Sequence, residues 1–260
     1  MQAVNEHVEM GGSAPDLSVV IPAWNEAERI TSTLEKLDAY LLSRNIKAEV
    51  LIVDDGSRDN TREVILAARA RFPYIQLVTY GADRTENHGK GYAVKFGMLK
   101  AKGNIVLFAD ADGSTPFESF DNMRKLFDEG YDVVIGSRYI QGSNIRVPQP
   151  FMRRVLSRVA NKLIQGMILW GIKDTQCGFK AFTHQACQDI FTKVTINRWA
   201  FDMEALVVAK RHHYKIVESP VSWDNSADTR VKFVSDARQT LHDLFYIKWN
   251  EWKGRYNPAK

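Results

Sequence analysis

The chain has 260 residues, of which 45% are hydrophobic and 25% charged, a composition typical of a globular protein with a full hydrophobic core. Its 35 lysines and arginines exceed its 31 aspartates and glutamates by only four, which argues against nucleic-acid binding through the phosphate backbone. The two cysteines, Cys177 and Cys187, exclude a disulfide scaffold and do not have the spacing of metal ligands.

Residues 1–16 are polar and lack the apolar stretch of a signal peptide, so we expect them to form a disordered tail. The sequence contains no run of about 18 apolar residues, the length that a membrane-spanning helix needs. We therefore expect a cytoplasmic protein.

Five short runs rich in β-branched and aliphatic residues predict strands. These runs are residues 17–22, 50–53, 75–79, 105–109 and 132–135. Between them, apolar residues recur at helical spacing from Ile30 to Leu41, and further helices are expected over about 60–71, after Gly91 and after Pro116. Strands that alternate with helices predict an α/β fold whose mostly parallel sheet is covered on both faces.

The second half of the chain is less regular. It contains a long helical stretch over about 151–170, a dense polar segment over 174–180 and a charged and aromatic segment over 198–204. We find no linker, repeat or low-complexity segment between the halves. We therefore expect one domain over 17–225, followed by a C-terminal amphipathic helical segment over 226–260.

Polar clusters follow each of the five predicted strands. They are residues 23–26, 54–57, 87–91, 110–112 and 136–138. In an open parallel sheet, ligands bind beyond the carboxyl ends of the strands, so these clusters predict a ligand site there. Within the first of them, Asn25 stands where a cap of the following helix is expected.

Asp110 and Asp112 give the strongest local signal. Alternate residues of an extended chain point the same way, so two such carboxylates can grip one Mg²⁺ or Mn²⁺ ion that takes its remaining ligands from a diphosphate. The alternative is a pair of solvated turn aspartates. Asp54, Asp55 and Glu26 at neighbouring strand ends predict a nucleoside pocket, and the Gly-Lys-Gly loop around Lys90 offers backbone N–H groups and a cation to a phosphate.

Several cations of the second half are candidates for binding a second anion. They are Arg138, Arg153, Arg154, Lys180, Arg198 and Arg230. Arg138 is the best of them because it ends a strand at the expected ligand face. If Asp202 and Glu204 are helical, their side chains diverge by about 200°, so that only one of them can face the site. Cys177 has no base beside it and is expected to be a buried structural thiol.

The C-terminal segment alternates aromatic and basic residues, including Phe245, Trp249 and Trp252 with Lys248 and Lys253. This mixture is typical of a helix that lies in a membrane interface. A helix that packs on the core or on a second subunit is equally amphipathic, so both readings stay open at this point.

The order of the polar motifs resembles that of the inverting glycosyltransferases of family 2, which have the GT-A fold, and within them the dolichyl-phosphate β-glucosyltransferase branch. The motifs are PAWNE at 22–26, VDDGS at 53–57, NHGKG at 87–91, ADADG at 109–113, GSR at 136–138, DTQCGFK at 174–180 and RWAFDMEAL at 198–206. The first motifs mark the broad family, whereas the last two are more specific to polyprenyl-phosphate sugar synthases.

The resemblance implies a role for each matching residue. The uridine would be held by Pro22, Trp24, Glu26, Asp54 and Asp55, the neighbouring donor region by Lys90, and the metal and diphosphate by Asp110 and Asp112 with Ala111 between them. Arg138 and Arg153 or Arg154 would approach the acceptor phosphate, and Asp202 or Glu204 would orient the sugar hydroxyls or a lysine. We therefore expect Asp112, Arg138, Asp202 and Glu204 to be the catalytic residues.

The expected reaction is transfer of glucose from UDP-glucose to dolichyl or another polyprenyl phosphate, with Mg²⁺ or Mn²⁺. A phosphomonoester is largely a dianion at neutral pH and needs little help from a general base, in keeping with the absence of a convincing base in the sequence. The protein would then lie on the cytosolic face of a membrane, with a homodimer as a further expectation. The sequence departs from the family at Trp24, His88 and Ser114, and lacks the N-terminal membrane anchor usual in the eukaryotic glucosyl enzymes.

Other functions stay open at this point. A UDP-GlcNAc or GDP-mannose donor, or a soluble acceptor, would use the same chemistry. A nucleotidyltransferase would need a glycine-rich loop with a lysine after the first strand, where the chain instead has residues 23–26. A non-catalytic nucleotide-sugar-binding protein is disfavoured because both Asp110 and Asp112 are present.

Overall fold

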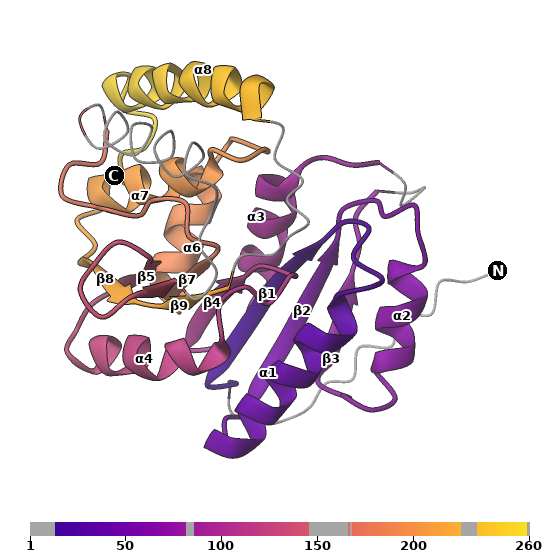
Figure 1. Ribbon diagram of the computed structural model, residues 1–260. Coiled ribbons are helices and arrows are strands. Elements are labelled where there is room, and N and C mark those ends of the chain that lie inside the picture. The colour runs from indigo at the N-terminus through magenta and orange to yellow at the C-terminus, as the bar shows by residue number, and fades with distance from the viewer. Residues whose placement is uncertain (1–13, 82–85, 146–165, 167, 225–232, 259–260) are drawn as a thin grey trace.

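The computed structural model describes residues 14–81, 86–145, 166, 168–224 and 233–258, with side chains from residue 239 onward in the last range (Figure 1). Most of the helical stretch expected over 151–170 lies outside these residues, as do Arg153, Arg154 and Arg230. Residues 1–13 of the expected tail lie outside them as well.

A seven-stranded, mostly parallel sheet forms the centre of the described part of the chain, as the sequence predicts. Its strands, in spatial order, are β3 (Ile75–Val78), β2 (Ala48–Asp54), β1 (Leu17–Ala23), β4 (Ile105–Ala109), β7 (Phe179–Thr183), β5 (Val133–Ser137) and β8 (Ile216–Pro220). Only β7 runs against its neighbours β4 and β5. Strands β7 and β8 were not among the strands expected from the sequence, and β7 begins inside the polar segment 174–180.

Helices cover both faces of the sheet (Figure 1). The first face carries α1 (Ile30–Arg44), α2 (Thr61–Ala68), the 3₁₀ turn η1 (Phe117–Ser119) and α4 (Phe120–Asp128). The second carries α3 (Lys90–Lys100), α6 (His184–Lys193), α7 (Phe201–Arg211) and α8 (Phe233–Trp252). A small parallel pair, β6 (Asn144–Ile145) with β9 (Ser222–Trp223), lies outside the main sheet.

Close packing of α3 on the sheet fixes the position of its N-terminus. A Cβ atom on Gly97 would lie 2.5 Å from a methyl group of Val20 and 2.8 Å from one of Val53, so this helix approaches β1 and β2 more closely than a side chain would permit. The N-terminal residue of α3 is Lys90. The packing therefore holds Lys90 at the carboxyl ends of the central strands.

The C-terminal helix α8 is attached to the domain by an apolar face. Leu244 and Ile247 are buried, and with Tyr256 beyond the helix they belong to the same core cluster as α6 and α7. Among the helices that the structure describes, none is both long and apolar enough to cross a membrane.

Candidate functional site

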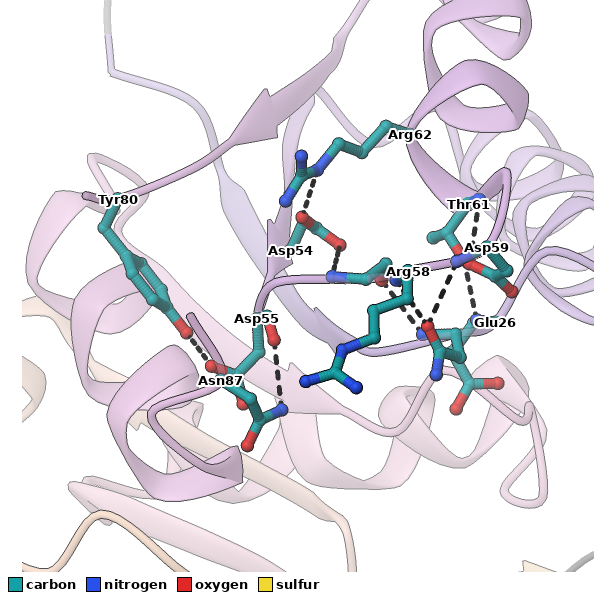
Figure 2. A network of polar contacts seen from close by, with 11 residues as sticks. Glu26, Asp54, Asp55, Arg58, Asp59, Thr61, Arg62, Tyr80 and Asn87 are labelled. Carbon is teal, nitrogen blue, oxygen red and sulfur yellow. Dashed lines mark hydrogen bonds and ion pairs between the residues drawn. The ribbon is translucent and has the colours of Figure 1, made fainter. Parts of the chain in front are cut away.

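The loops after β1 and β2 are tied together at the edge of the sheet (Figure 2). Asn25 adopts a left-handed backbone conformation with φ of 54°, and its side-chain oxygen accepts the N–H groups of Arg58 at 2.8 Å and Asp59 at 3.4 Å. The backbone N–H of Glu26 donates to the Thr61 hydroxyl at 2.8 Å. The expectation that Asn25 caps the following helix was therefore wrong: α1 begins five residues later, and Asn25 joins two loops.

Asp54 and Asp55 are neighbours in the chain but point to different partners (Figure 2). The buried carboxylate of Asp54 pairs with Arg62 of α2 and accepts the N–H of Ser57 at 3.1 Å. Its geometry is that of a residue that holds the loop, with both oxygens directed at the protein.

Asp55 binds the N-terminus of α3. Its carboxylate accepts the Tyr80 hydroxyl and the N–H groups of His88 at 2.8 Å and Gly89 at 2.9 Å. Burial raises the pKa of Asp55, and these hydrogen bonds act against that rise. The N–H group of Gly89, which belongs to the loop that the sequence predicts to bind a phosphate, thus donates to Asp55 instead.

The two glycines beside Lys90 serve close packing. A Cβ on Gly89 would lie 2.5 Å from the carbonyl oxygen of Asn197, and a Cβ on Gly91 would lie 2.5 Å from that of Ile196. The N–H of Tyr92 donates to the Asn197 carbonyl at 3.1 Å. The segment before α7 therefore packs closely against the start of α3 and fixes its position.

Trp24 and Glu26 belong to the loop after β1, and Arg58 belongs to the loop after β2. Glu26 forms an ion pair with Arg29 at 2.7 Å, and Trp24 is partly exposed. In the view of Figure 2 the exposed Arg58 side chain extends between Asn87 and Glu26. Arg58 was missed by the sequence analysis, although its place directly after the acidic loop was a usable signal.

The acidic loop after β4 carries the centre of the site. The Lys90 ammonium lies 2.7 Å from Oδ1 of Asp110, and Oδ1 of Asp112 accepts the Ser114 N–H at 3.0 Å. The Thr33 hydroxyl of α1 donates to the carbonyl of Ala111 at 2.8 Å and so holds the middle of the loop. Burial disfavours the charged form of Lys90, but Asp110 and Asp202 outweigh burial, so the pKa of Lys90 is raised.

Strand β7 supports the same loop from the other side. The N–H of Asp110 donates to the carbonyl of Gly178 at 3.1 Å, and the Asp110 carboxylate lies directly over Gly178. A small cleft adjoins them, lined by Ala109, Asp110, Ser114, Thr115, Phe117, Gly178, Phe179 and Trp223. Trp223 is a second residue that the sequence analysis missed.

A buried ion pair stands behind this loop. The ammonium of Lys180, whose side chain is 1% exposed, lies 2.8 Å from Asp202 and also donates to the carbonyl of Cys177. Burial raises the pKa of Asp202, while Lys180 and Lys90 act in the opposite direction. Asp202 thus pairs with a lysine, and its expected role in orienting a lysine or the sugar hydroxyls stays a prediction.

Glu204 lies on a different side of α7. Its carboxylate accepts the N–H groups of Thr195 at 2.8 Å and Ile196 at 2.7 Å and the Tyr256 hydroxyl at 2.7 Å. These contacts attach the segment before α7 and the C-terminal residues to the helix. The structure therefore brings Asp202 to the site but gives Glu204 a role in holding the loop, because the two diverge on the helix as their spacing predicts.

Arg138 forms a bidentate pair with Asp174. Its Nε and Nη2 atoms lie 2.7 Å and 2.9 Å from the two carboxylate oxygens, and the backbone N–H of Arg138 donates to Asp174 at 3.0 Å. Burial opposes both charges, but the mutual attraction prevails and lowers the pKa of Asp174 and raises that of Arg138. The guanidinium also lies 5.4 Å from the ring centre of Trp223, which connects it to the cleft beside Asp110.

Cys177 is buried beside this pair, and burial raises the pKa of its thiol to about 12. A thiol that stays protonated is a poor nucleophile, so Cys177 has the structural character expected from the sequence.

His88 stacks on Tyr92 at a ring-centre distance of 4.8 Å.

The residues of this site suit a hard divalent cation in their chemistry. Two carboxylates, Asp110 and Asp112, lie on one loop, and the ammonium of Lys90 already places a positive charge against the first of them. Among the residues that the structure describes, no group of three or more His, Cys, Asp and Glu side chains could hold a metal alone. The pair therefore fits a cation that also takes ligands from a bound phosphate.

Solved structures resemble this fold at low sequence identity. Glucosyl-3-phosphoglycerate synthase from Mycobacterium tuberculosis, solved with Mn²⁺, UDP-glucose and phosphoglyceric acid, has a TM-score of 0.64 at 19% identity, over 95% of this chain and 81% of that one. Mannosyl-3-phosphoglycerate synthase from Rubrobacter xylanophilus has a TM-score of 0.64 at 15% identity, over 93% and 76%. These likenesses establish the GT-A-like fold.

Sequence relatives are much more similar. The dolichyl-phosphate beta-glucosyltransferase ALG5A of Trichomonas vaginalis is 38% identical over 252 residues, which cover 92% of this chain and 76% of the relative. The dolichyl-phosphate beta-glucosyltransferase of Homo sapiens is 31% identical, over 89% and 74%. Residues 18–191 match the glycosyl transferase family 2. The chain therefore belongs to glycosyl transferase family 2 and is a hexosyltransferase of that family.

Proposed function

We propose that the protein transfers glucose from UDP-glucose to the phosphate of dolichol or a similar polyprenol, with inversion at the anomeric carbon. The relatives that cover most of the chain carry this activity in their names. The observation that carries the proposal is the group of Lys90, Asp110 and Asp112 at the strand ends, where charge of both signs meets a cleft. Such a group suits a nucleoside diphosphate with a divalent cation.

In this proposal the nucleotide lies across the loops after β1 and β2. Trp24 and Glu26 with the adjoining Pro22 would contact the uridine, whereas Asp54 and Asp55 would shape its pocket through their bonds to Arg62 and to the start of α3. Asp110 and Asp112 would hold Mg²⁺ or Mn²⁺. That cation, when bound, would stabilise the charge that develops on the leaving diphosphate.

The acceptor would approach from the side of Arg138 and Trp223. A phosphomonoester has a second pKa near 6 and is mainly a dianion at neutral pH, so it needs orientation more than deprotonation. Since Arg138 is already paired with Asp174, its guanidinium would act chiefly by positioning Trp223 and the cleft wall. Arg153 and Arg154, which lie outside the described residues, stay candidates for direct contact with the acceptor phosphate.

A lipid acceptor requires that the enzyme meet a membrane surface, and α8 offers a suitable face. Phe245, Trp249 and Trp252 are 65%, 53% and 72% exposed, whereas Leu244 and Ile247 bind the helix to the core. The Lys253 ammonium lies 4.9 Å and 5.0 Å from the ring centres of Trp249 and Trp252. Aromatic rings beside lysines suit the interface of a bilayer with anionic headgroups.

Trp170 is a further exposed aromatic residue. It is 82% exposed, and its carbonyl accepts the ammonium of Lys210 from α7 at 2.9 Å. We therefore place the enzyme peripherally on a membrane, on the cytosolic face, where UDP-glucose would be supplied. The alternative is that a second copy of the chain covers this face in a homodimer. A vesicle-binding experiment distinguishes membrane binding from dimer formation.

The donor and acceptor are tested together by an extraction assay. The protein is incubated with dolichyl phosphate and radiolabelled UDP-glucose, UDP-GlcNAc or GDP-mannose, with Mn²⁺ or Mg²⁺ and with EDTA as a control. Metal-dependent label from UDP-glucose in the organic phase supports the proposal. Label from another donor would change the sugar, and an aqueous product only would change the acceptor.

A further inference from the structure

Lys90 neutralises Asp110 directly. Its ammonium lies 2.7 Å from Asp110 Oδ1, in reach of the electrostatic influence of Asp112 and Asp202 as well. The side chain is 23% exposed, so the contact lies at the border between the protein and the cleft. The ammonium therefore places its positive charge at the position where a divalent cation bound by Asp110 would place its charge.

The charges around the loop are nearly balanced without any bound ion. Lys90 and Lys180 supply two positive charges against the three negative charges of Asp110, Asp112 and Asp202. A divalent cation alone would turn this excess of one negative charge into an excess of one positive charge. A nucleoside diphosphate that arrives with the cation would offset that charge, so the two ligands should favour each other.

The backbone at Lys90 is held by close packing, and its ammonium lies beside two aromatic rings. Gly89 and Gly91 are packed against the carbonyls of Asn197 and Ile196, which holds the backbone of the loop. The ammonium lies 5.4 Å from the ring centre of Phe108 and 5.2 Å from that of Trp199. The four-carbon stem of a lysine turns readily, and aromatic faces keep an ammonium attracted on the way.

We infer that Lys90 is an internal counter-ion that occupies the cation position against Asp110 and moves to the diphosphate when the donor and its divalent cation bind. This inference rests on the proposed function and assigns Lys90 a positioning role within it. Lys90 should make the protein bind the cation weakly by itself and strongly together with UDP. Lys90 then adds to the coupling that arises because the diphosphate itself supplies ligands to the cation.

The test measures Mn²⁺ binding to the full chain by the loss of the free-ion signal in electron paramagnetic resonance, with and without UDP, after correction for the Mn²⁺ that UDP binds in the absence of protein. For the unsubstituted protein we expect UDP to raise the Mn²⁺ affinity about tenfold or more. In Lys90→Met the Mn²⁺ affinity without UDP should rise about tenfold, and the factor by which UDP raises that affinity should fall about tenfold. Lys90→Arg, which keeps the charge, should keep the coupling.

Lys100→Met is the matched control, because Lys100 is an exposed residue of the same helix. It should leave both affinities unchanged. Lys90→Gln carries the same expectation as Lys90→Met if the methionine variant does not fold, as judged by circular dichroism. Undiminished coupling in Lys90→Met, or weaker Mn²⁺ binding with and without UDP alike, would overturn the inference.

These measurements use no acceptor and no sugar transfer. A failure of the proposed function would be seen elsewhere, as the absence of labelled lipid in the extraction assay. The two results can therefore be told apart.

Discussion

The carboxylate of Asp110 occupies the space that a side chain on Gly178 would need. A Cβ atom at residue 178 would lie 1.9 Å from Oδ2 and 2.3 Å from Cγ of Asp110. The backbone joins the same two residues, since the Asp110 N–H donates to the Gly178 carbonyl at 3.1 Å. Residue 178 must therefore be a glycine, because the Asp110 carboxylate at the end of β4 occupies the space that a larger side chain would need.

Gly178→Ala should displace the Asp110 carboxylate from its place beside Lys90. We expect transfer activity and Mn²⁺ binding in the presence of UDP to fall about a hundredfold, because misplacing a reacting group by about 1 Å has effects of that order. The overlap should cost about 1–3 kcal/mol of stability. Activity, Mn²⁺ binding and chemical unfolding measure the three effects.

Gly166→Ala serves as the control, because among the residues that the structure describes a Cβ atom there would meet nothing within 4 Å. It should leave both activity and Mn²⁺ binding unchanged. Normal Mn²⁺ binding by Gly178→Ala would show that the Asp110 carboxylate is not held in the position described.

Asp174→Asn should destabilise the protein strongly. It removes the partner of a buried guanidinium, and breaking a buried ion pair in this way costs about 3–5 kcal/mol. Asp121→Asn removes a comparable bidentate partner from Arg44, but that pair is exposed to solvent, so the loss should be much smaller. Urea unfolding of both variants gives the comparison, and equal losses would contradict it.

The same pair predicts a dependence of stability on pH. The pKa of Asp174 is lowered in the folded state from its ordinary value of 3.8, so between the two pKa values the unfolded chain binds more protons than the folded one. The stabilisation is fully present above pH 3.8 and is lost as the pH falls through the folded-state pKa. Asp174→Asn should therefore lose less stability on acidification than the unsubstituted protein, as followed by unfolding at several acidic pH values.

Cys177 and Cys187 should be inert toward Ellman's reagent in the folded protein at neutral pH. Both thiols are buried, and burial raises both pKa values, so little thiolate is present. Both should react at once in guanidinium chloride. Rapid reaction of one thiol under native conditions would contradict the burial described.

The exposed face of α8 should carry the binding to membranes. Trp249→Ser with Trp252→Ser should lower binding to phosphatidylcholine–phosphatidylserine vesicles about tenfold or more, because two large apolar side chains lose their contact with lipid. Leu42→Ser with Leu66→Ser, which changes exposed leucines of α1 and α2, is the control. Unchanged vesicle binding together with a change in oligomeric state would assign this face to a second copy of the chain.

The sequence predicted five of the six mutually parallel strands of the main sheet, because each of the five is a short run rich in apolar residues, but it did not predict β8. The strand expected over 105–109 has those bounds in the structure. Strand β7 escaped prediction because Lys180 is its second residue, and the charge of Lys180 is buried against Asp202, which is 22 residues away. Contacts of that range leave no local pattern.

The candidate site shows the same division. Its residues could be collected from the strand ends, because parallel strands bring those ends together. The different roles of these residues could not be predicted from the sequence. Asp54 and Asp55 are identical neighbours in the sequence, but Asp54 pairs with Arg62 and Asp55 binds the start of α3. Likewise, the sequence alone suggests that Arg138 is available to bind an anion, whereas in the structure it pairs with Asp174.

The configuration of the product tests the central claim most directly. The protein is incubated with UDP-glucose, dolichyl phosphate and Mn²⁺, and the lipid product is extracted and its anomeric centre is examined by nuclear magnetic resonance, with Asp112→Asn as the parallel sample. The account predicts a β-linked glucosyl phosphate from the unsubstituted protein and none from the variant. An α-linked product, free glucose alone, or equal product from both samples would contradict it.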